Sequence, residues 1–149
     1  MAERNQFRVS CKAALFTEDL SEVLLAEYDS GHYGLPGGHI EEADDSPETA
    51  VARELQEEFG LEGVDLEIKH SWFHDNGKLV IGYMGVISKD TQIKVQVEEL
   101  EAATWTPVHE IESGQVIVRS YAKFILKCVG INADVSQQSS SPALQIDHQ

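Results

Sequence analysis

Short apolar and alternating runs, separated by turn residues, predict that most of the regular structure in this chain is β-strand. The first two runs are joined by a turn at Thr17-Glu18-Asp19. The third and fourth flank Asn76-Gly77, the strongest short signal for a β-hairpin. The predicted strands cover residues 7–16, 22–28, 64–74, 79–87, 92–97 and 103–106.

A four-residue apolar period predicts a helix over residues 47–59. Ser46 is a suitable N-cap, and Pro47 suits the first helical position because its missing N–H has no partner there. Gly60 fits the position after the helix, where a left-handed conformation is common. The stripe expected to face the core consists of Val51, Leu55 and Phe59.

The rest of the pattern completes a single domain. A helical turn is predicted at residues 107–112 and a second amphipathic helix at 116–129. The fold class is therefore α/β, with a mixed sheet packed between helices, and one domain over residues 1–131. Residues 132–149 are rich in Ser and Gln, and we expect them to form a disordered tail.

Charge and composition narrow the classes of partner. The chain has 11 Lys and Arg against 26 Asp and Glu, a formal charge of −15, which disfavours binding to a nucleic-acid backbone. There is no long apolar run or secretion signal, so we expect a soluble cytoplasmic protein that neither spans nor binds a membrane. The two cysteines, Cys11 and Cys128, are expected to be reduced.

Three glutamates of the first helix lie on one face. Glu54 is a neighbour of Glu57 and Glu58 at spacings of three and four, and Arg53 can pair with Glu57. A hard divalent cation would turn the mutual repulsion of these carboxylates into binding. The alternative for such a cluster on its own is a solvated acidic face.

The segment before this helix favours the metal. Gly34-Leu35-Pro36-Gly37-Gly38 can approach a ligand closely, because its glycines carry no side chain. This run followed by the acidic helix resembles the signature of the Nudix hydrolases, outlined as G-x5-E-x7-REUxEExGU, with U aliphatic. Residues 53–61, RELQEEFGL, fit the second half at every fixed position.

The first half of the motif differs from the outline. Counting back seven residues from Arg53 gives Asp45 in place of Glu, and six residues instead of five separate Gly38 from Asp45. The carboxylate is kept on a side chain one methylene shorter. A Nudix-fold module that binds nucleotides without turnover is therefore the alternative to an enzyme.

The resemblance implies a Nudix-type α/β/α sandwich and a role for each carboxylate. Glu57 and Glu58 would be the main ligands of Mg²⁺ or Mn²⁺. Glu54 would be a further ligand or the base that activates water, so that Glu54, Arg53 and Glu57 form the catalytic set. The main-chain carbonyl of Gly37 or Gly38 would complete part of the metal shell.

Two further acidic positions follow from the resemblance. Arg53 would orient the carboxylates, and Asp45 would be an auxiliary metal ligand or the partner of Arg53. A second acidic segment is expected shortly before a Trp near the end of such domains. Here that segment precedes Trp105, and Glu99 is our choice within it; a polar turn is the alternative.

Three residues outside the motif are candidates for contact with the substrate. His39 follows the glycines and could touch phosphate or simply belong to a strand. Trp72 and Tyr83 could stack on a base or sugar, although buried aromatic residues on strands more often belong to the core. His70 and His74 would lie about 13 Å apart on a strand, too far to share one zinc ion.

The function implied is hydrolysis of a phosphoanhydride in a nucleoside diphosphate linked to another group. The substrate would be a small nucleotide: a nucleoside triphosphate, nucleotide sugar, ADP-ribose or dinucleotide. Divalent ions would neutralise the phosphate oxygens and activate water. A homodimer is left open, because dimers are common in the family.

Overall fold

The computed structural model describes residues 7–96, 98, 100–114 and 116–131. The predicted tail, residues 132–149, lies outside the described residues. Within them, none of the helices is long and apolar enough to cross a membrane. In chain order the elements are β1 (Val9–Phe16), β2 (Glu22–Tyr28), β3 (Tyr33–Gly34), β4 (Gly37–His39), α1 (Pro47–Phe59), β5 (Glu67–Phe73), β6 (Leu79–Val86), β7 (Leu100–Pro107), α2 (Val108–Ser113) and α3 (Arg119–Cys128).

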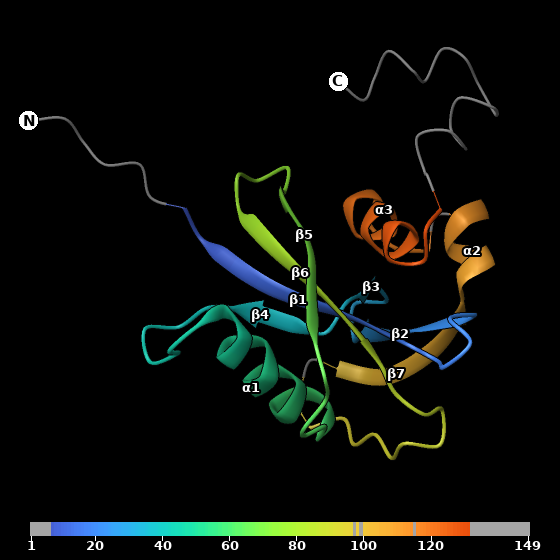
Figure 1. Ribbon diagram of the computed structural model, residues 1–149, viewed down its shortest axis with the longest axis horizontal. Coiled ribbons are helices and arrows are strands. Elements are labelled where there is room, and N and C mark those ends of the chain that lie inside the picture. The colour runs from blue at the N-terminus through green and yellow to red at the C-terminus, as the bar shows by residue number, and fades with distance from the viewer. Residues whose placement is uncertain (1–6, 97, 99, 115, 132–149) are drawn as a thin grey trace, which may run out of the picture.

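The strands form one mixed sheet that lies between helices (Figure 1). Its main path runs β3-β2-β1-β6-β5, with β4 paired to β1 and β7 paired to β2. The central pair, β1 and β6, is parallel, and the other pairs are antiparallel. Helix α1 covers one face, and α2 and α3 lie over the other. The predicted α/β/α sandwich with a mixed sheet is confirmed.

Two hydrophobic clusters lie on the two faces of the sheet, because side chains alternate along each strand. In β1, Ala14 and Phe16 join the cluster beneath α3, while Leu15 joins the cluster beneath α1. On β6, Gly82 lets the ring of Phe124 in α3 approach the sheet. A Cβ at Gly82 would lie only 2.6 Å from that ring.

Helix α1 begins and ends where its sequence predicts. The Ser46 hydroxyl accepts a hydrogen bond from the Thr49 N–H at 3.1 Å, and Pro47 is the first helical residue. At the other end Gly60 takes a left-handed conformation (φ 68°), and its N–H donates to the Gln56 carbonyl. Both signals are local in sequence, so the boundaries of α1 do not depend on the rest of the fold.

The strand predicted at residues 92–97 is wrong. In the structure, residues 92–96 form no strand and do not pair with the sheet, and Val97 lies outside the described residues. The N–H groups of Lys94 and Gln96 donate to the carbonyls of Phe59 and Glu58, at 2.9 and 3.0 Å. The last carbonyls of a helix have no partner within it, and this segment supplies one.

Other predicted boundaries shift because pairing partners decide them. The strand expected at 64–74 spans only β5, and its register with β6 is irregular between Ile68 and His70. The strand expected at 103–106 is longer, as β7, and the helix expected at 116–129 begins at Arg119. Strands β3 and β4 were not predicted, because runs of two and three residues are too short to show alternation.

Candidate active site

Helix α1 and strand β4 bring an acidic side chain against a bare stretch of main chain. Gly38 lies opposite Cys11 of β1 and so shares the sheet face that α1 covers. A Cβ at Gly38 would collide with the carboxylate of Glu54, which is packed directly over it. Glycine at this position therefore makes the approach of Glu54 possible.

Glu58 fixes the end of the same glycine run. Its Oε1 accepts a hydrogen bond from the Gly37 N–H at 2.9 Å, and the residue is only 9% exposed. A carboxylate hydrogen bond to a buried N–H is charge-assisted and stronger than a neutral one. Glu58 thus joins α1 to β4 and keeps the main chain of Gly37 beside the helix.

The two glycine carbonyls differ in availability. Ala13 N–H donates to the Pro36 carbonyl at 2.9 Å, and hydrogen-bonded pairs recur at every second residue of an antiparallel ladder. The next such pair is Cys11 with Gly38, so the Gly38 carbonyl belongs to the ladder. The Gly37 carbonyl lies between these pairs, outside the ladder, and accepts a hydrogen bond from Lys12 Nζ at 3.4 Å.

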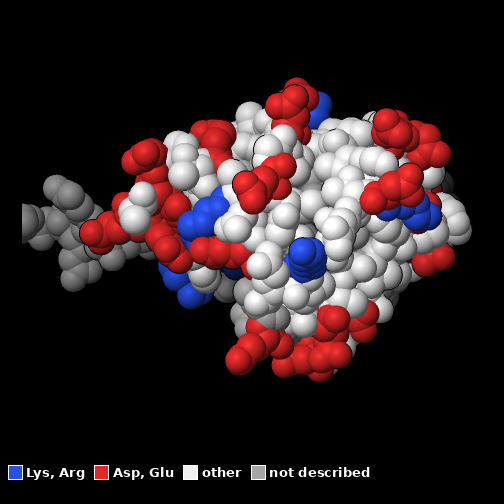
Figure 2. Space-filling view, turned by 90° about the horizontal axis from the view of Figure 1, so that it is seen from below, with Lys and Arg blue, Asp and Glu red and all other residues white. Residues whose placement is uncertain are grey.

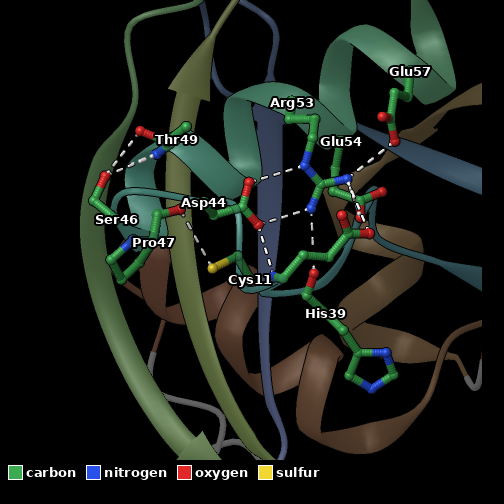
Figure 3. Close-up of polar contacts among 10 residues, drawn as sticks. Cys11, His39, Asp44, Ser46, Pro47, Thr49, Arg53, Glu54 and Glu57 are labelled. Atoms are coloured by element: carbon green, nitrogen blue, oxygen red, sulfur yellow. Dashed lines mark hydrogen bonds and ion pairs between the residues drawn. The ribbon is translucent and has the colours of Figure 1, made fainter.

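Arg53 contacts four carboxylates, among them Glu41 at 3.6 Å, and one main-chain carbonyl (Figure 3). Its Nε and Nη2 each donate to one oxygen of Asp44 at 3.0 Å, in a bidentate pair. Its Nη1 contacts Glu54 Oε2 at 3.3 Å and Glu57 Oε1 at 3.1 Å. Nη2 also donates to the main-chain carbonyl of His39 at 3.4 Å. The guanidinium therefore holds two of the helix carboxylates in place.

Of the two aspartates before α1, Asp44 and not Asp45 pairs with Arg53, which corrects the prediction of Asp45 as its partner. An auxiliary metal-binding role for Asp45 stays a prediction. Asp44 is separated from Gly38 by five residues, the spacing of the motif outline, and the extra residue lies between Asp44 and the helix. The Asp44 side chain is 4% exposed and also accepts from the Glu41 N–H at 2.7 Å, whereas Asp45 is exposed. Counting forward from Gly38 would have found Asp44.

Burial and neighbouring charges set the proton affinity of these carboxyls. Burial raises the pKa of Glu54 above its ordinary value, and Arg53 opposes that shift. Hydrogen bonds from Arg53 lower the pKa of Asp44. Glu54 is therefore a better proton acceptor than an ordinary glutamate, while Asp44 stays ionised and holds Arg53.

The three candidates for substrate contact lie in different places. The His39 ring, on an exposed residue at the end of β4, points away from the carboxylates (Figure 3). Tyr83 is 1% exposed beneath α1, and its hydroxyl donates to Glu48 at 2.6 Å, so it supports the helix. Trp72 packs on the α3 side of the sheet against Phe124. Glu99 lies outside the described residues.

Two carboxylates of α1 are joined through Arg53. Among the residues that the structure describes, no three Asp, Glu, His or Cys side chains are close enough together to hold a metal. Arg53 Nη1 lies between the carboxylates of Glu54 and Glu57. The surface on the α1 side carries many carboxylates and few basic groups (Figure 2), so cations are attracted to this face.

Comparison with known proteins gives concordant matches. The family model of the NUDIX domain matches residues 7–127 of this chain. A putative hydrolase, 111R, of Invertebrate iridescent virus 3 is 47% identical over 51 residues, which are 34% of this chain and 30% of the viral protein. The match thus spans less than a third of that relative.

Two solved structures share the fold. The NUDIX domain of Shewanella oneidensis NrtR, complexed with ADP ribose, has a TM-score of 0.73 and 22% identity, covering 85% of this chain and 88% of that one. A MutT protein from Methanosarcina mazei has a TM-score of 0.67 and 20% identity, covering 94% and 99%. At these identities the likeness shows the fold alone.

Proposed function

The chain belongs to the NUDIX family, and from this we propose that it is a Mg²⁺- or Mn²⁺-dependent hydrolase of small nucleotides. It would cleave a phosphoanhydride bond in a nucleoside diphosphate linked to another group. The observation that supports this most is the Glu54 carboxylate packed on Gly38, with Arg53 joining it to Glu57. ADP-ribose, bound by the Shewanella protein, is one member of the substrate class.

The donor set fits a hard divalent cation. It consists of oxygens alone, from Glu54, Glu57, Glu58 and the Gly37 carbonyl, and Mg²⁺ and Mn²⁺ prefer oxygen ligands. Glu54 and Glu57 are held by the same guanidinium nitrogen, so small side-chain rotations would bring them to a common ion. Such an ion supplies charge neutralisation of the phosphate and a lower pKa for bound water.

The remaining catalytic roles would fall to side chains and main-chain groups of this chain. Glu54, with its raised pKa, would accept the proton of the attacking water. Asp44 would hold Arg53, and Arg53 would keep Glu54 and Glu57 in register. The bare main chain at Gly37 and Gly38 would let the phosphate approach without a side chain in its way.

The test is turnover of a panel of nucleoside triphosphates, nucleotide sugars, ADP-ribose and dinucleotides with Mg²⁺ and with Mn²⁺. We expect Glu57→Gln to lose at least about a hundredfold in rate, in line with the several kcal/mol that a catalytic metal contributes. Glu62→Gln, an exposed acid just past the end of α1, is the matched control. Equal rates for Glu57→Gln and the parent would refute this role for Glu57.

A binding module without turnover is the second candidate, and the extra residue between Asp44 and α1 favours it. This extra residue is a departure from the motif outline, and it lies beside Asp44, the carboxylate that holds Arg53. The same panel decides: no turnover together with metal-dependent nucleotide binding would favour the module.

A further inference from the structure

Lys12 places a positive charge beneath the glycine run. It lies in the middle of β1, opposite Gly37, and between neighbours, Cys11 and Ala13, that are fully buried. Its Nζ donates to the carbonyls of Leu35 and Gly37, each at 3.4 Å. The ammonium group is therefore next to the segment where α1 and the glycines meet.

The surroundings of this ammonium suit an anion. Its two hydrogen bonds are long and go to neutral carbonyls, whereas charged donors form their strongest hydrogen bonds with anions. On its other side the ring of Tyr121 in α3 has its centroid 5.9 Å away, near enough for a cation–π contact. A half-buried cation held this loosely can exchange a carbonyl for a stronger partner.

Arg53, a second cation near the glycine run, is not available to bind phosphate. Arg53 is bound by Asp44, Glu54 and Glu57, so its hydrogen-bond donors are already directed at carboxylates. A nucleotide phosphate that enters this acidic region needs a positive partner. Lys12 alternates with Cys11 and Ala13 along β1, so it reaches the glycine run from the sheet face opposite to theirs.

We propose that Lys12 is a substrate-contacting residue whose ammonium binds a phosphate of the nucleotide at the glycine run. The inference rests on the proposed function. The Gly37 carbonyl is the candidate metal ligand, and two cations cannot comfortably share one oxygen. Metal binding would displace Lys12 from Gly37, and the phosphate carried with the metal would become its partner.

The experiment compares Lys12→Met, which keeps the length and removes the charge, with Lys12→Arg. Lys89→Met is the control, because Lys89 is an exposed lysine that pairs with Glu22. The measurements are kcat and KM, the Kd of ADP with Mg²⁺ by calorimetry, and the Kd of Mn²⁺ alone. We expect Lys12→Met to raise KM and the ADP Kd roughly 10- to 100-fold. Lys12→Arg and Lys89→Met should stay within about threefold of the parent.

The affinity for Mn²⁺ alone distinguishes a contact between Lys12 and phosphate from a purely structural role of Lys12. If Lys12 contacts phosphate, Lys12→Met binds Mn²⁺ at least as tightly as the parent. Unchanged ADP binding, or a parallel loss of Mn²⁺ and ADP binding, would overturn the proposal, as would a parent that does not bind ADP with Mg²⁺. Should Lys12→Met fail to fold by circular dichroism, Lys12→Gln replaces it. Turnover by the parent tests the proposed function separately.

Discussion

The two neighbouring aspartates before α1 provide a direct test of how Arg53 is held. Asp44 accepts two hydrogen bonds of 3.0 Å from Arg53, and its side chain is almost fully covered. In Asp44→Asn one carboxylate oxygen becomes an NH₂ that faces a guanidinium donor, so one hydrogen bond and the charge are lost. Groups that orient metal-site residues from behind typically change affinity or activity by about 10- to 100-fold when replaced. We therefore expect Asp44→Asn to reduce the rate of hydrolysis by about 10- to 100-fold.

Asp45→Asn is the matched control, since Asp45 is exposed and Arg53 binds its neighbour. The assay is initial rate against Mn²⁺ concentration at a fixed nucleotide level, with a thermal unfolding curve for each variant. Asp45→Asn should remain within about twofold of the parent. A larger loss in Asp45→Asn than in Asp44→Asn would show that our assignment of the Arg53 partner is mistaken.

Two further predictions concern the same region. In Gly38→Ala the new methyl group displaces the flexible Glu54 carboxylate. Rate assays should show activity roughly 100-fold lower, while calorimetry should show a thermal midpoint changed by only a few degrees. Normal activity would contradict the packing of Glu54 on Gly38. Burial raises the pKa of Cys11 from 9.0 to about 11 and that of Cys128 to about 12. At pH 8 both thiols should therefore react with iodoacetamide at least about 100-fold more slowly in the native protein than in urea. The native reaction should become faster as the pH rises toward 11. Equal native and unfolded rates at pH 8 would contradict their burial.

Features that depend on neighbouring residues could be predicted from the sequence. The start of α1 at Pro47 and its end at Phe59 follow from Ser46 and Gly60, whose capping bonds lie within the helix. The alternating and apolar runs likewise identified β1, β2 and β6, within two residues at each boundary. Capping hydrogen bonds and the period of apolar side chains depend on residues close in sequence, so they can be predicted without knowing where the other elements lie.

Features that depend on distant partners could not be predicted in this way. Residues 92–96 have the composition of a strand, but the N–H groups of Lys94 and Gln96 donate to carbonyls at the end of α1 and not to the sheet. Counting back from Arg53 points to Asp45, yet the guanidinium binds Asp44, the neighbouring carboxylate within its reach. A lysine inside an apolar strand, Lys12, was visible in the sequence, but its acceptors come from a segment more than twenty residues away.

Because β1 pairs in parallel with β6, the active site can form only when most of the domain has folded. Val9 pairs with Leu79, and the glycine run and α1 both lie between them along the chain. Such distant pairing raises the contact order, which slows folding. A nascent chain that has emerged only as far as α1 lacks the strand that completes the centre of the sheet. Catalytic competence should therefore appear during biosynthesis only after β6 has left the ribosome, together with the native fold.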